Sequence, residues 1–93
     1  MAQNDRRFDY DPMIYDVMRE SATRLGGEFI DLANHAGTEA EREAFIVADR
    51  GLMNEARQVD AHDVEAVKAM TDEFGERLRM IEDAEKQDER KAA

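Results

Sequence analysis

The chain has 93 residues, no cysteine and a formal net charge of −10 at pH 7, from 13 basic and 23 acidic residues. This charge repels phosphate backbones and disfavours nucleic-acid binding, and the lack of cysteine excludes disulfides and thiolate metal sites. Because no stretch approaches the ~20 apolar residues of a membrane span and residues 1–7 do not resemble a signal peptide, we expect one small cytoplasmic domain without membrane association.

The first predicted helix spans residues 12–36 and follows a polar segment, residues 1–9, that we expect to be a flexible arm. Asp11 can cap this helix, Pro12 suits its first position, and Gly37 predicts a left-handed C-cap. Its apolar residues recur at steps of three and four, which predicts a core-facing stripe. The stripe consists of Tyr15, Met18, Ala22, Leu25, Phe29, Leu32 and Ala36.

Two further helices are predicted, over residues 39–58 and 61–85. Thr38 and Glu41 have the spacing of a capping box for the first of these, and Asp60 is the expected start of the second. Residues 87–93 read as a polar tail. The expected core positions are Phe45, Ala48, Leu52, Ala56 and Val59, followed by Val64, Val67, Met70, Phe74, Leu78 and Ile81.

These elements predict an all-α fold, an antiparallel three-helix bundle over residues 10–86 with a long first helix and up-down-up topology, because both connections are short. Glycines fall near the middle of each helix, at Gly26-Gly27, Gly51 and Gly75. A glycine costs a helix about 1 kcal/mol relative to alanine. We therefore expect these glycines to form a shared layer of close helix approach.

The first helix carries a second apolar face, opposite its core stripe. Met13 and Val17 lie on this face, with Phe8 and Tyr10 just before the helix, and aromatic residues and methionine are enriched in interface cores. Ile46 and Met53 indicate a similar surplus on the second helix. The alternatives are scattered surface residues or self-association. The predicted partner-binding residues are Phe8, Tyr10, Asp11, Met13, Asp16, Val17, Glu20 and Arg24.

The sequence contains no signature of catalysis. Ser21 is the only serine and falls inside a predicted helix, and no phosphate-binding loop is present. Asp60, His62, Asp63 and Glu65 are close in sequence, but at a helix start they fan around different faces instead of converging on a metal. We expect no enzyme activity, no cofactor and no metal site.

In its order of helices, length and hydrophobic rhythm, the chain resembles the epsilon antitoxins of zeta–epsilon toxin–antitoxin systems and the small partners of related zeta-like kinases. The resemblance covers about residues 8–86 and includes Phe8-Asp9-Tyr10 before the long helix and Val59-Asp60 before the last. It implies a cognate toxin with a P-loop kinase fold, encoded nearby, that phosphorylates a small metabolite such as a nucleotide sugar. It also implies neutralisation by laying the first helix, here residues 10–24, across the nucleotide pocket.

A second functional class is compatible with the same sequence. A self-associating helical structural protein, or a phage-type assembly protein without inhibitory activity, would also use an extra apolar face. The gene next to this one and the oligomeric state distinguish the two classes.

Overall fold

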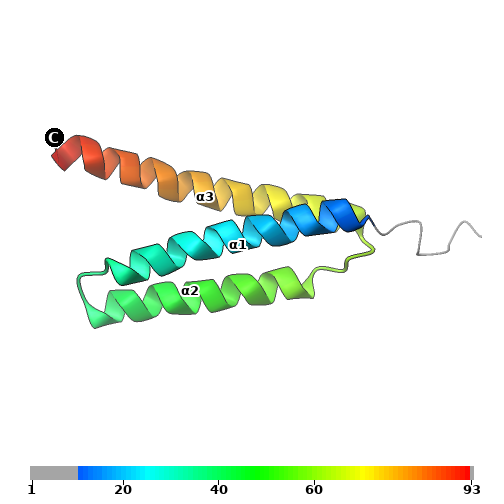
Figure 1. Cartoon of the computed structure of the whole chain (residues 1–93), viewed down its shortest axis with the longest axis horizontal. Helices are drawn as coiled ribbons and strands as arrows, with labels where there is room; N and C mark the ends of the chain where they lie inside the picture. Colours follow the sequence, from blue (N-terminus) through cyan, green and yellow to red (C-terminus); the bar gives the residue numbers. More distant parts are fainter. Residues whose placement is uncertain (1–10, 93) are drawn as a thin grey trace, which may run out of the picture.

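The computed structural model describes residues 11–92, and the side chains of residues 11–88. It contains three helices, α1 (Pro12–Asn34), α2 (Glu39–Gln58) and α3 (Val64–Ala92), and no strand among the described residues (Figure 1). The predicted all-α fold is confirmed.

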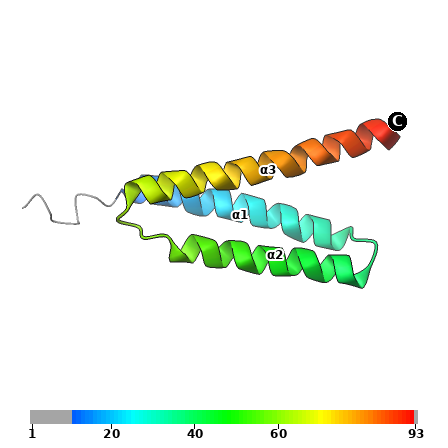
Figure 2. The ribbon, with the colours of Figure 1, turned by 180° about the vertical axis from the view of Figure 1, so that it is seen from behind.

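Helix α1 is the centre of the molecule. It packs against both α2 and α3, whereas the backbones of α2 and α3 make few direct contacts with each other (Figures 1 and 2). Helix α2 runs antiparallel to α1 and α3 runs parallel to α1, so the predicted up-down-up order is confirmed. Because α1 is held on two sides, its remaining surface is presented on a fixed scaffold.

The predicted start signals of α1 and α2 are present. The Asp11 carboxylate accepts hydrogen bonds from the backbone N–H groups of Met13 and Ile14, at 3.0 and 3.2 Å. The Thr38 hydroxyl accepts one from the N–H of Glu41 at 3.1 Å and donates to the Glu41 carboxylate at 3.1 Å. These side chains satisfy N–H groups that have no partner within their helices.

The predicted end of the first helix is wrong. Helix α1 ends at Asn34, and no described glycine, Gly37 included, has a positive φ. Instead, the His35 N–H donates to the carbonyl oxygens of Asp31 and Leu32, both at 3.2 Å, and the His35 ring nitrogen Nδ1 lies 2.9 Å from the Asp31 carbonyl oxygen. The last carbonyls are thus satisfied without a left-handed residue.

The predicted bounds of the third helix are also wrong at both ends. Asp60 caps a turn, accepting from the His62 N–H at 2.9 Å, while Asp63 accepts from the Ala66 N–H at 3.0 Å and starts α3. Helix α3 continues to Ala92, through most of the segment that was predicted as a polar tail. Lys, Glu, Arg and Gln are good helix formers even without an apolar stripe.

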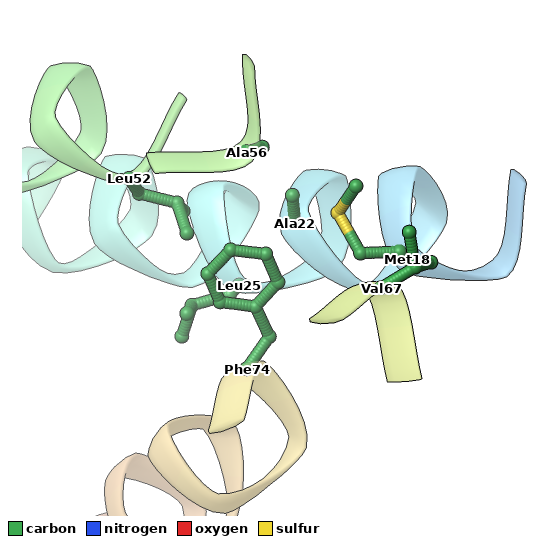
Figure 3. Packing of buried hydrophobic residues seen from close by; sticks show 7 residues of the cluster. All are labelled: Met18, Ala22, Leu25, Leu52, Ala56, Val67 and Phe74. Carbon is green, nitrogen blue, oxygen red and sulfur yellow. The ribbon is translucent and has the colours of Figure 1, made fainter. Parts of the chain in front are cut away.

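The core is a single cluster with members from all three helices (Figure 3). Leu25, Phe74 and Met18 are fully buried, and the Phe74 side chain extends from α3 toward α1 and α2, into the same cluster as Leu25 and Leu52. The cluster consists of Met18, Ala22, Leu25, Leu52, Ala56, Val67 and Phe74. All seven lie on the predicted core stripes, so the core-facing side of each helix was predicted correctly.

Of the glycines in the expected close-approach layer, only Gly26 marks such an approach. A Cβ at Gly26 would lie 2.6 Å from the Asp49 carboxylate oxygen and 3.1 Å from Met53 Cε. A Cβ at Gly27 or Gly51 would meet nothing within 4 Å, and one at Gly75 would meet only the end of the Arg79 side chain. The prediction of a shared glycine layer is therefore wrong.

An ion pair joins the two outer helices. Arg77 of α3 makes two hydrogen bonds of 2.8 Å to the Glu55 carboxylate of α2 and a third of 2.8 Å to Glu73. The hydrogen bonds from Arg77 lower the pKa of Glu55, and those to Glu55 and Glu73 raise the pKa of Arg77. This bidentate pair links α2 to α3 where their backbones are apart.

Candidate functional site

The exposed face of α1 begins in the first turn of the helix. Met13 has 75% of its surface exposed and Val17 45%, although both residues are apolar. They are four residues apart and so lie on one face of α1, followed along the same line by Glu20 and Arg24. The structure thus keeps the predicted second apolar face out of the core.

A groove adjoins this face on the side of α3. It has a volume of about 370 Å³ and is lined by Met13, Ile14 and Val17 of α1 and by Lys68, Thr71 and Asp72 of α3. Thr71 and Asp72 follow Lys68 by three and four residues, so all three lie on the same side of α3 within one helical turn. The sequence did not point to Ile14, Lys68 and Thr71, because their place at the groove depends on how α3 is rotated against α1.

Two hydroxyl groups near the groove donate hydrogen bonds within their own helices. The Thr71 hydroxyl donates to the Val67 carbonyl oxygen at 3.0 Å, and the Ser21 hydroxyl donates to the Val17 carbonyl oxygen at 2.9 Å. Neither hydroxyl needs a partner from outside. An apolar group entering the groove therefore leaves no hydrogen-bond donor of these two residues unpaired.

The charged side chains of three of the predicted partner-binding residues lie on the surface. Asp16, Glu20 and Arg24 are exposed, and the Arg19 guanidinium lies 5.9 Å from the centre of the Tyr15 ring. Asp11 has a structural role as the N-cap of α1. Phe8 and Tyr10, together with the predicted arm of residues 1–9, lie outside the described residues.

On α2, the two residues predicted to form a second apolar face are not the exposed ones. Met53 packs against the core cluster and Ile46 is half-buried, so the Met53 part of the prediction is wrong. Among the described residues outside α1, the large apolar residues that are exposed are Val47 of α2, at 59%, and Met80 of α3, at 65%. Neither residue had been singled out in the sequence, because single apolar residues on a helix surface are normal.

The described residues hold no cluster of three or more histidine, aspartate or glutamate side chains that could bind a metal ion. Within that part of the chain, no buried side-chain nitrogen or oxygen lacks a hydrogen-bond partner either. The carboxylates of Asp60 and Asp63 are occupied by backbone N–H groups. These side chains form a turn and a cap.

Acidic side chains from α1 and α3 meet near the end of α1. Burial and a hydrogen bond with the Glu85 carboxyl group raise the pKa of Glu28, and the charges of Glu85, Asp31 and Glu82 raise it further. Like charges gather here without a cation that lowers the pKa of Glu28.

Comparisons with protein-family models, with curated proteins and with solved structures found no match to this chain. Among the described residues, no helix is both long and apolar enough to cross a membrane. The candidate functional site is therefore the exposed face of α1 together with its groove against α3.

Proposed function

We propose that this chain is a protein-binding inhibitor, an antitoxin or chaperone-like partner that neutralises a zeta-like kinase toxin with a P-loop fold. The resemblance to epsilon antitoxins supplies the identity of the partner. In this proposal the first half of α1 lies over the nucleotide pocket of the toxin and blocks substrate binding.

One observation carries the proposal: Met13 and Val17 remain exposed on the helix that is otherwise the most enclosed in the molecule. Asp16 and Glu20 lie exposed beside them. A nucleotide pocket offers cationic groups that bind phosphates, and an acidic helix can compete for those groups.

The test is neutralisation of the kinase encoded beside this gene. We expect that kinase to arrest growth when it is expressed alone and to be harmless when this chain is co-expressed. A variant with Met13→Asp and Val17→Asp should fail to rescue growth at equal protein level. Rescue by that variant, or the absence of any neighbouring kinase, would contradict the proposal.

A second candidate is a self-associating structural or assembly protein. The exposure of Val47 and Met80 on the outer helices favours it, because these residues offer apolar surface away from α1. Light scattering separates the candidates: a stable homo-oligomer that loses its assembly with Val47→Asp would support the structural function.

A further inference from the structure

We infer that, in the free protein, residues 7–9 fold back over the groove between α1 and α3, so that Phe8 covers Met13 and Val17. This segment precedes the described part of the chain, which starts at residue 11. The contact itself does not depend on the identity of a partner. Its consequence, that a partner must displace Phe8 to reach the exposed face of α1, rests on the proposed function.

The groove lies next to the point where this segment joins α1. All of its α1 lining comes from the first six residues of the helix. Met13 and Val17 therefore lie only about 3 and 9 Å along the helix axis from Asp11. The chain from Asp11 back to Phe8 spans up to about 10 Å when it is extended. A segment that turns back at Tyr10 is thus long enough to bring Phe8 to a level between Met13 and Val17.

The size of the groove suits one aromatic ring. Its volume is about 370 Å³, and its lining covers about one turn of each helix. A cavity of about 150 Å³ already encloses a benzene ring. Met13, with 75% of its surface exposed, can move onto such a ring, because the methionine sulfur makes favourable contacts with aromatic edges. The groove therefore takes a single ring and its neighbouring backbone, which is what one short segment supplies.

Two charges on α3 match the spacing of two charges in the segment. Lys68 and Asp72 line the groove, are both exposed, and lie about 6 Å apart along the helix because they are four residues apart. In an extended segment, Arg7 and Asp9 are about 7 Å apart and point to the same side, opposite to Phe8. One side of the segment can therefore pair with α3 while Phe8 faces α1.

The direction of the chain decides which charges meet. Helix α3 runs parallel to α1, so Lys68 lies nearer to the start of α1 than Asp72 does (Figures 1 and 2). A segment that turns back at Tyr10 passes Lys68 first, so Asp9 meets Lys68. Arg7 then meets Asp72, and both pairs have opposite signs.

The other charges near the groove do not select a strongly charged occupant. Five exposed carboxylates are offset by four cations there, and one of each already forms an ion pair of 2.7 Å within α3. A segment with one charge of each sign fits this balance, whereas a second copy of the chain brings a formal charge of −10. The carboxylates are those of Asp16, Glu20, Glu65, Asp72 and Glu76, and the cations are Arg19, Arg24, Lys68 and Arg79.

The first test is an NMR measurement on the full, isotope-labelled chain without a partner. We expect nuclear Overhauser contacts between the Phe8 ring and the side chains of Met13 and Val17. In a mixture of labelled and unlabelled protein, these contacts should arise within one chain and not between two.

Charge reversal tests the register of the segment. Asp9→Lys and Lys68→Glu should each weaken the contacts of the Phe8 ring, because each variant brings like charges together. The double variant exchanges the two charges and should restore the contacts. Asp5→Lys makes the same change of charge outside the contact, so it is the matched control for Asp9→Lys and should have no effect.

Proteolysis measures how often the segment leaves the groove. Trypsin cleaves after Arg7 only when the bond is accessible, so the rate follows the population of the open form. Val17→Asp removes apolar contact with Phe8 and should speed this cleavage about fivefold. Val47→Asp on α2 changes an exposed apolar residue elsewhere and should leave the rate unchanged. Circular dichroism of both variants should match the wild type.

Three results would overturn the inference. The first is a lack of contacts from the Phe8 ring to Met13 and Val17, and the second is equal cleavage of the wild type and Val17→Asp. The third is contact between chains in the mixed sample, which would make a second copy the occupant. A chain that keeps the Phe8 contacts but neutralises no kinase would instead contradict only the proposed function.

Discussion

Gly26 is the described glycine at which side chains of α2 come closest to the backbone of α1. A Cβ at this position would press on the Asp49 carboxylate and on Met53, so α2 lies close to α1 at this level. The glycines at positions 27 and 51 have open space around them and still lower the helical propensity of α1 and α2. The structure thus separates one packing glycine from two that packing does not require.

This difference predicts unequal outcomes for alanine substitutions. Gly27→Ala and Gly51→Ala should each raise the free energy of unfolding by about 0.5–1 kcal/mol, because alanine favours the helix and meets no neighbour. Gly26→Ala should gain less, because the ends of the Asp49 and Met53 side chains must move aside and this offsets part of the gain in helix propensity. Urea unfolding of the three variants measures this, and a Gly26→Ala variant as stable as Gly27→Ala would contradict the close approach.

The raised pKa of Glu28 predicts that this residue makes the stability of the fold depend on pH. Its pKa is raised by burial and by its hydrogen bond with Glu85, so the folded protein binds the proton more tightly than the unfolded chain. The ionised form therefore opposes folding, and the stability associated with protonated Glu28 is lost as pH rises through the raised pKa. Glu28→Gln should raise the melting temperature at pH 7, by about 2–4 °C, and make little difference at acidic pH.

The control for Glu28 is Glu43→Gln on the exposed surface of α2, which removes the same charge from an already acidic protein. Equal stabilisation by both variants at pH 7 would mean that net charge alone is responsible. Thermal unfolding over the range from about pH 4 to pH 8 distinguishes the two explanations.

At the scale of elements, α1 is the helix that packs against both of the others. Its buried residues meet side chains from both neighbours, while α2 and α3 meet through the side chains of the core and the pair between Arg77 and Glu55. Leu25 is fully buried at the centre of this arrangement, whereas Phe29 is only partly buried.

Truncations along α1 should follow that order. Leu25→Ala should cost about 2–5 kcal/mol, because it opens a cavity beside Phe74 and Leu52. Phe29→Ala should cost less than a fully buried aromatic residue does, since part of its ring is already in water. A loss below about 1 kcal/mol for Leu25→Ala would mean that the core lies elsewhere.

The pair between α2 and α3 predicts a specific requirement for arginine. Arg77→Lys keeps the charge but cannot make the two parallel hydrogen bonds to Glu55, so it should behave more like Arg77→Ala than like the wild type. Both partners are partly exposed, and solvent screening limits the coupling to about 0.5–1 kcal/mol in a double-mutant cycle with Glu55→Gln. Because the pKa of Glu55 is lowered, this stability should be present at neutral pH and be lost as pH falls through the carboxylate range. A coupling that persists in acid would contradict the ion pair.

The elements also show which parts of the fold the sequence predicts. Asp11-Pro12 and the spacing of Thr38 and Glu41 locate two helix starts, because each cap acts over a few residues. The start of α3 was ambiguous, since Asp60 and Asp63 can both accept backbone hydrogen bonds and only the path of the connection decides which one begins the helix. The rotation of each helix about its own axis also cannot be determined from the sequence pattern. For this reason, periodicity alone did not show which glycines lie at a close approach or that Val47 and Met80 are exposed.

At the scale of the whole molecule, a rigid central helix presents an apolar strip within an acidic surface. The strip at Met13 and Val17 was predictable because it lies opposite a strict core stripe, whereas the α3 side of the groove required the packing of the two helices. We propose that this strip binds a partner and is not needed for the fold.

The measurement that tests this claim most directly compares the wild-type chain with the variant carrying Met13→Asp and Val17→Asp, in thermal unfolding and in co-purification from the native host. We expect the variant to melt within about 4 °C of the wild type, because both side chains are exposed. We also expect it to lose the protein that co-purifies with the wild type, whereas Val47→Asp should retain that protein. A collapse of the melting temperature, or an unchanged partner on the doubly substituted chain, would contradict the claim.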